Sequence, residues 1–213
     1  MKTAVRSAPA ALPVPLRRPL TVVALLAAIV VVVLGVLHFH DSGLTGLDAA
    51  VLPSLDGVQP PWRYLALVFD FCGEPVGATL LVAAITIACL AARRVRTALL
   101  TVLGIVVTVG VTTVLKPLVG RTIHGGYLSY PSGHTALATA LTLAVAMALT
   151  SRFGRLAAFA VVLASALVAA LAMGWAEVAL GAHYPTDAVG GFCAALAVIP
   201  AMAWLVDRVA DRI

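Results

Sequence analysis

The sequence contains few charged residues, and acidic residues are the scarcest. Only 11% of its 213 residues are charged, and nine of them are Asp or Glu. A soluble globular domain has about 25% charged residues, so this composition excludes an ordinary soluble domain. Three cysteines are too few for a disulfide framework, because Cys89 and Cys193 fall within apolar runs and only Cys72 lies near the end of one. Aromatic residues make up 6% of the chain.

Long apolar runs take up most of the chain instead. Hydrophobic residues make up 62% of it, and the mean hydropathy is +1.08. A bilayer core about 30 Å thick is crossed by about 20 apolar residues in a helix. Six such runs occur, at about residues 20–38, 74–92, 97–115, 133–150, 156–175 and 186–206. We therefore predict an all-α, integral membrane bundle of six transmembrane helices.

The bundle is expected to be a single domain, since no internal repeat, linker or second soluble domain is visible over residues 1–213. Its predicted parts are a cytoplasmic tail (1–19), the six-helix bundle (20–206) and a second cytoplasmic tail (207–213). The first run has a basic lead, as a signal peptide does. However, it is longer than a typical signal core and is followed by no small-residue cleavage site, which favours a membrane anchor.

Basic residues predict the orientation, because Lys and Arg next to short loops are retained on the cytoplasmic side. Three of the fourteen, Lys116, Arg121 and Arg63, fall on one side of the predicted membrane. The other eleven fall on the opposite side: Lys2, Arg6, Arg17, Arg18, Arg93, Arg94, Arg96, Arg152, Arg155, Arg208 and Arg212. Both termini are therefore expected in the cytoplasm. Because the basic residues are scattered over four segments, they do not form the stripe that nucleic-acid binding requires.

Between the first two runs, residues 43–73 combine prolines and aromatic residues with short apolar stretches. The stretch at 62–71 is too short to cross a bilayer, and Trp62 and Tyr64 suit the headgroup region. We expect an interfacial segment on the outer face. A lip through which a lipid substrate enters is the functional alternative.

A first group of polar residues follows the third run. Lys116 ends that run, Arg121 and His124 follow it, and Pro-Ser-Gly-His occupies residues 131–134. A fixed ammonium and a guanidinium fork both suit phosphate oxygens, although snorkelling at the interface explains many such side chains. Ser132 is predicted to be the N-cap of the fourth helix and Gly133 to allow close approach of the backbone. The positive end of that helix then faces an anion beside His134.

A second group precedes the sixth run and contains His183 and Asp187. Pro185 suits the first turn of a helix, and Asp187 complements the positive helix end, so helix capping explains both residues without a function. Capping does not explain His183. A carboxylate four residues away can hold one ring nitrogen while the other nitrogen presents its lone pair, as in a nucleophile with an orienting acid.

These motifs resemble the type 2 phosphatidic acid phosphatases, which are membrane lipid phosphatases that share their active-site pattern with the soluble vanadium haloperoxidases. The family pattern is Lys, six residues, Arg-Pro; then Pro-Ser-Gly-His; then Ser-Arg, five residues, His, three residues, Asp. Lys116, His134, His183 and Asp187 match it in place. The resemblance implies that His183 attacks phosphorus to give a phosphohistidine, that His134 protonates the leaving group and that Asp187 orients His183. It implies no metal and no cofactor.

Two family arginines are missing. Ile123 and His124 replace the first Arg-Pro, with Arg121 two positions early, and Ala176 and Glu177 replace Ser-Arg. A hydrogen bond to a charged group contributes about 1.5–3 kcal/mol, so phosphate affinity is expected to change. Three hypotheses follow: Arg121 turns inward as a substitute, His124 donates to phosphate when protonated, and Glu177 pairs with Arg121.

The predicted function is that of a membrane phosphatase acting at the extracytoplasmic face on a lipid phosphate or diphosphate. A polyprenyl compound such as undecaprenyl diphosphate, phosphatidic acid and phosphatidylglycerol phosphate all fit. The alternative from another class is a non-catalytic lipid-phosphate binder or transporter, which the carboxylate of Glu177 favours. A haloperoxidase and a purely structural membrane protein fit less well. His38 and His40 are too few for a metal site and are expected to be interfacial.

Overall fold

The computed structural model describes residues 9–44, 46–55 and 57–212, so Lys2 and Arg6 lie outside the described part. Eight α-helices account for most of it: α1 (Arg17–Leu37), α2 (Gly46–Leu55), α3 (Trp62–Gly73), α4 (Pro75–Ala91), α5 (Val95–Val119), α6 (Gly133–Leu149), α7 (Arg155–Ala179) and α8 (Pro185–Ala210). The 3-10 turn η1 (Val14–Leu16) precedes α1, and the 3-10 turn η2 (Thr150–Arg152) follows α6. Strands β1 (Thr122–Ile123) and β2 (Tyr127–Leu128) form a small antiparallel hairpin.

The predicted all-α membrane bundle is confirmed. In the described part, α1, α5, α6, α7 and α8, with the adjoining 3-10 turns, are long and apolar enough to cross a bilayer. Helices α3 and α4 reach that length only together, and they are bent by 68° where they meet. The bend has a local cause, because Glu74 is extended and Pro75 begins a new helix there. This bent pair provides the sixth candidate span.

Helix α6 is the most enclosed span. About two thirds of its apolar window is buried, against about one fifth for α1. Leu143 and Met147 of α6 pack in one core with Leu100 of α5 and Ile199 of α8. The outer faces of α1 and α7 carry exposed Val and Leu side chains, as lipid contact requires. The polar ends of α6 and α8 are therefore held by packing along the whole bundle.

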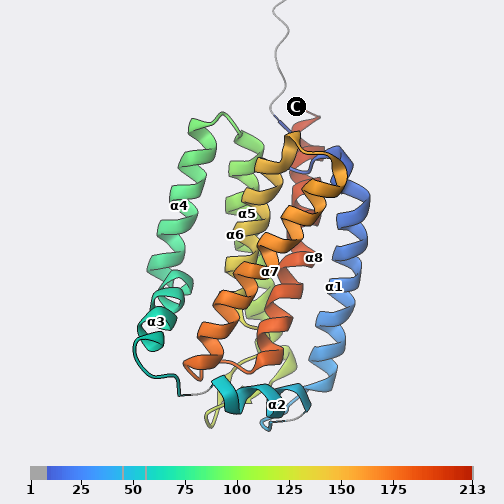
Figure 1. Ribbon diagram of the computed structural model, residues 1–213. Coiled ribbons are helices and arrows are strands. Elements are labelled where there is room, and N and C mark those ends of the chain that lie inside the picture. The colour runs from blue at the N-terminus through green and yellow to red at the C-terminus, as the bar shows by residue number, and fades with distance from the viewer. Residues whose placement is uncertain (1–8, 45, 56, 213) are drawn as a thin grey trace, which may run out of the picture.

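Both described ends of the chain lie at one end of the bundle (Figure 1). Asp207 in the last turns of α8 is buried and accepts hydrogen bonds from the backbone amides of Ala11 and Leu12, at 2.8 and 2.9 Å. Arg96 of α5 pairs with the same carboxylate at 3.3 Å. Helix α2 lies across the opposite end, where the β1–β2 hairpin and the starts of α6 and α8 also meet (Figure 1).

Candidate active site

Two helix starts that are more than fifty residues apart in sequence are joined directly by a backbone hydrogen bond. The amide of Ser132 donates to the carbonyl of Asp187 at 3.0 Å. Gly191 permits this approach, because a Cβ at that position would overlap the carbonyl of Ser132. The Pro-Ser-Gly-His turn and the first turn of α8 therefore form one surface.

Both predicted helix caps are confirmed. The hydroxyl of Ser132 accepts from the amide of Thr135 at 3.2 Å at the start of α6. Asp187 accepts from the amide of Tyr184 at 2.9 Å in a capping box, and Pro185 occupies the first turn of α8. The capping hydrogen bond thus fixes the orientation of the Asp187 carboxylate independently of any ligand.

The two imidazoles converge on one oxygen atom. Oε2 of Glu177, near the end of α7, lies 3.7 Å from Nε2 of His183 and 3.9 Å from Nδ1 of His134. On its other side His183 directs Nδ1 to Oδ2 of Asp187 at 3.5 Å. Nε2 is therefore the nitrogen of His183 that faces the site. The hypothesis that Glu177 pairs with Arg121 is wrong, because its carboxylate lies between the two histidines.

Arg121 lies behind Asp187 and does not face an open pocket. Its side chain is fully buried, and its guanidinium contacts Asp187 at 2.6 Å, Asp48 at 2.5 Å and the hydroxyl of Thr186 at 2.7 Å. The ring of Tyr184 stacks on it at 4.2 Å. This corrects the expectation that Arg121 substitutes for a phosphate-binding arginine, since two buried carboxylates occupy its Nη1 and Nη2 groups.

His124 also differs from the expectation. It has a positive φ of 48° in the turn of the hairpin, and its Nε2 lies 2.7 Å from the carbonyl of Gly181. There it lines an outer cavity of about 400 Å³ together with Tyr184 and Ser42. The structure therefore places His124 against a loop carbonyl, in contacts that do not include the two histidines. The turn geometry of the hairpin decides its direction.

Sequence reasoning missed Asp48, which is fully buried in α2. Its carboxylate accepts from the amide and the hydroxyl of Thr186, at 2.8 and 2.7 Å, and pairs with Arg121. An acidic residue in the otherwise apolar segment of α2 was the available signal. Asp48 ties the interfacial helix to the first turn of α8.

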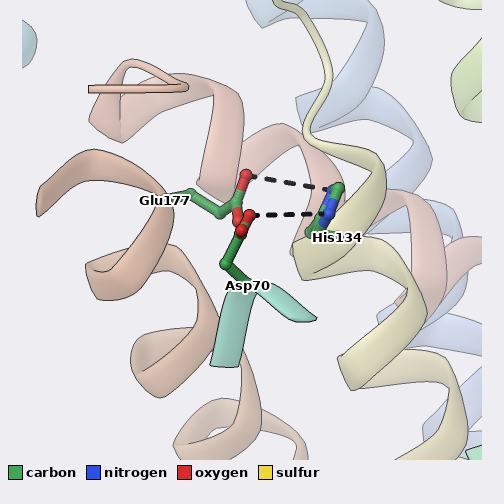
Figure 2. A group of neighbouring side chains, drawn as sticks. All are labelled: Asp70, His134 and Glu177. Atoms are coloured by element: carbon green, nitrogen blue, oxygen red, sulfur yellow. Dashed lines mark ion pairs between the residues drawn. The ribbon is translucent and has the colours of Figure 1, made fainter. Parts of the chain in front are cut away.

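Sequence reasoning also missed Asp70 and Glu74, at the end of α3 and the bend before α4. Oxygens of these side chains lie 3.8 and 3.9 Å from Nε2 of His134. Figure 2 shows Asp70 and Glu177 on neighbouring elements, with both carboxylates directed at the His134 ring. Gly73 brings α3 this close, since a Cβ there would overlap the ring.

Lys116 lies in the last turn of α5, half-buried, as the predicted cation of the site. Its ammonium group is close enough to Asp187 and Glu177 to interact with both electrostatically. Nearby, burial raises the pKa of Tyr184, so its hydroxyl stays protonated and lies 3.4 Å from the carbonyls of Ser42 and Thr122. Lys116 is thus a residue predicted to bind phosphate whose positive charge interacts with Glu177, the carboxylate between the two histidines.

Fold and site together define a multi-pass membrane protein with two histidines and several carboxylates gathered at one end of its helices. A profile of the PAP2 superfamily matches residues 97–211, from α5 to the end of α8. The match covers more than half of the chain, and the protein belongs to this superfamily.

One solved structure has a closely similar fold. It is described as the first transmembrane PAP2 type phosphatidylglycerolphosphate phosphatase, from Bacillus subtilis, and it matches with a TM-score of 0.68. The match covers 89% of this chain and 96% of that one at 22% identity, which establishes the shared fold. No curated protein matches the sequence.

Proposed function

We propose that this protein is a membrane phosphatase that hydrolyses a lipid phosphate or diphosphate through a phosphohistidine intermediate. The observation that carries the proposal is the convergence of His134 and His183 on one point, 3.9 and 3.7 Å from the same oxygen of Glu177. Two imidazoles at such a distance can act on the same phosphorus from opposite sides.

The roles follow from which atoms face the site. His183 attacks with Nε2, forming a P–N bond, while the P–O bond to the lipid breaks. Asp187 lies 3.5 Å from Nδ1 of the same ring. Arg121 pairs with Asp187, and Asp48 pairs with Arg121. His134 is the proposed donor of the proton that the departing oxygen takes up, and water then releases phosphate from His183.

A lipid substrate is supported by an apolar groove beside the site. The groove has a volume of about 850 Å³ and runs between α4 and α5. Ala78 and Thr79 line one end of it, four and five residues after Glu74, which contacts His134. Val82, Val109 and Leu137 continue the lining into the bundle. An acyl or prenyl chain in this groove would place its phosphate near the histidines.

The proposed orientation puts the site on the extracytoplasmic side. Four arginines lie in or directly beside the α4–α5 and α6–α7 connections, at the end of the bundle that also holds both described chain ends (Figure 1): Arg93, Arg94, Arg152 and Arg155. Positive charge in short loops favours the cytoplasm, so the opposite end with α2 and the histidines faces outward.

The first test measures phosphate release from a panel of detergent-solubilised lipid phosphates and diphosphates. We expect turnover by the wild-type protein and a loss of at least about 10³-fold in kcat for His183→Ala, because the nucleophile is removed. Acid-labile, base-stable labelling of the wild-type protein by a ³²P-substrate would identify the phosphohistidine. Full activity of the His183→Ala protein would overturn the mechanism, and lipid-phosphate binding without turnover in both proteins would favour the binder or transporter.

Turnover should also depend on pH with a bell-shaped profile. His183 attacks only when neutral, so kcat falls at low pH, and the proton donor acts only when protonated, so kcat falls at high pH. The measurement is kcat against pH with one saturating substrate. A kcat that falls neither at low pH nor at high pH would contradict the assignment of His183 as the nucleophile and of a second group as the proton donor.

A further inference from the structure

The two ring nitrogens of His134 face different groups. Nδ1 lies 3.9 Å from the Glu177 oxygen that Nε2 of His183 approaches at 3.7 Å, so Nδ1 is the nitrogen on the reacting side. Nε2 lies instead 3.8 Å from Oδ1 of Asp70 on α3 and 3.9 Å from Oε1 of Glu74 at the bend before α4. The proposed reaction uses Nδ1 and gives Nε2 no role.

Nε2 of His134 is also a buried polar atom without a hydrogen-bond partner in the described part of the chain. Buried polar atoms are nearly always paired, so an unpaired one needs an explanation. A carboxylate on the non-reacting nitrogen of a catalytic histidine fixes the ring and stabilises its protonated form. Such contacts are often long without substrate and shorten when it binds, which agrees with the 3.8 Å to Asp70.

The bend between α3 and α4 brings Asp70 to this nitrogen. Gly73 is the last residue of α3, and a Cβ there would overlap the His134 ring, so the backbone of α3 lies against the imidazole. Residues three apart share a helix face, which turns Asp70 toward the ring that Gly73 contacts. Figure 2 shows the Asp70 carboxylate directed at His134 from α3.

His134 is the basic group that the charge of Asp70 compensates. Over residues 9–44, 46–55 and 57–212, no other basic side chain has a nitrogen within 4.0 Å of the carboxylate of Asp70 or Glu74. Glu177 differs from both, because the ammonium group of Lys116 interacts with it. Glu74 is also the more exposed of the two, with 54% of its side chain accessible against 29% for Asp70.

Charged and titratable side chains face His134 from every element that packs against it. They are Asp70 from α3, Glu74 from the bend, Lys116 from α5, Glu177 from α7 and His183 from the loop before α8. The three carboxylates favour the protonated ring, whereas Lys116, a protonated His183 and burial oppose it. Asp70 and Glu74 therefore offset the burial of the ring.

We propose that Asp70 is a positioning residue for His134: its carboxylate accepts from Nε2 and holds the ring protonated, with Nδ1–H toward the departing oxygen. The inference rests on the proposed phosphatase function. It also gives the site a cation beside the phosphate, although Glu177 occupies the position of an arginine in the family pattern.

The proton balance is complete with these residues and water. As His183 forms the P–N bond and the P–O bond to the lipid breaks, the proton on Nδ1 of His134 passes to the lipid oxygen. Neutral His134 then takes a proton from the water that attacks the phosphohistidine, and the P–N electron pair returns to His183. Phosphate, neutral His183 and protonated His134 result.

The first experiment measures kcat against pH with the best lipid of the panel. Asp70→Asn should move the high-pH limb to lower pH by about 1 unit, which is about a tenfold lower kcat on that limb, because an opposite charge at this distance favours the protonated ring. KM should change less than kcat, since no substrate contact is removed. Asp70→Glu keeps the charge and should restore most of the shift.

Two further variants are the controls. Glu74→Gln should move the limb by less than half as much, because water screens its exposed charge. Asp211→Asn should not move it, since Asp211 is an exposed carboxylate at the opposite end that pairs with Arg96. Size-exclusion profiles establish folding, and Asp70→Ser replaces Asp70→Asn if the latter does not fold. An unmoved limb in the folded Asp70 variant overturns the proposal.

The second experiment does not need turnover. The histidine ring signals of selectively ¹³C-labelled, detergent-solubilised full-length protein are titrated by nuclear magnetic resonance, and the His134 signal is assigned by its loss in His134→Ala. Its midpoint should lie about 1 pH unit lower in Asp70→Asn than in the wild type and in Asp211→Asn. That shift without turnover of any lipid would overturn the phosphatase and not the role of Asp70. Turnover with an unchanged midpoint overturns the role of Asp70 and not the phosphatase.

Discussion

At the scale of single residues, Arg121 shows how burial decides a role. Residue type alone makes a loop arginine a candidate for binding phosphate. Three neighbours decide otherwise, since Asp48, Asp187 and the Thr186 hydroxyl accept from its Nη1 and Nη2 groups, and its side chain is fully buried. Arg121 is therefore a positioning residue for Asp187, which faces His183.

Replacing Arg121 should affect stability and turnover together. Arg121→Ala leaves two buried carboxylates without their cation, and we expect the free energy of unfolding to fall by about 3–5 kcal/mol. The measurement is a thermal unfolding midpoint in detergent. In the folded fraction kcat should fall more than KM changes, because Asp187 loses its support while no substrate contact is removed.

Arg208→Ala is the matched control for that experiment. Arg208 is an exposed arginine of α8 whose only described aromatic partner is Trp204, at 5.4 Å. Its replacement should change stability by less than about 0.5 kcal/mol. Equal changes in the free energy of unfolding for the two replacements would show that the buried ion pairs of Arg121 do not stabilise the protein.

At the scale of secondary-structure elements, the bend between α3 and α4 brings two acidic residues to the site. The sequence separates residues 62–71 from a span that begins at 74, and two helices with these starts are observed, but α4 reaches the length of a span only together with α3. It gives no sign that α3 packs against the start of α6, because that contact depends on the 68° bend. Gly73, Asp70 and Glu74 reach His134 through this packing.

The contact at Gly73 can be tested directly. In Gly73→Ala the new methyl group would overlap the His134 ring, so the ring must leave its observed position. We expect kcat to fall at least about tenfold, since a displacement of about 1 Å in an active site has an effect of that size or larger. The assay is phosphate release from the best lipid of the panel.

Gly154→Ala provides the control, because a Cβ at Gly154 would meet no atom within 4 Å and the residue is the N-cap of α7. Its activity should equal that of the wild type. A Gly73→Ala protein as active as this control would mean that His134 does not need its observed position.

At the scale of the whole molecule, the bundle separates two ends of different chemistry. One end holds both described chain ends, tied together through Asp207. The other end holds α2 and the starts of α6 and α8, where the sequence places His134 and His183. Because the bundle crosses a membrane, these ends face different compartments. The side that each end faces is the orientation proposed above from the distribution of basic residues.

Orientation can be measured with single cysteines in a background that lacks Cys72, Cys89 and Cys193. Tyr127→Cys lies in the exposed hairpin near the site, and Phe153→Cys lies in the exposed loop between α6 and α7. In intact cells a membrane-impermeant maleimide should label the first variant and label the second only after permeabilisation. The reverse pattern would place the active site in the cytoplasm.

The sequence by itself determined the membrane class, the helical spans and the caps at Ser132 and Asp187. These features depend on local composition and on hydrogen bonds between neighbours in the chain, both of which can be read from consecutive residues. It also identified the two histidines through their motifs.

Only the tertiary structure decided which charges surround those histidines. Asp48 and Asp70 approach the site from α2 and α3, and their partners are more than sixty residues away in the chain. Contacts of this kind depend on how helices pack and bend. The spacing of residues in the sequence therefore did not predict that Arg121 pairs with Asp48 and Asp187, or that Asp70 and Glu74 contact His134. Charge in a site is set by neighbours in space, which a linear motif does not contain.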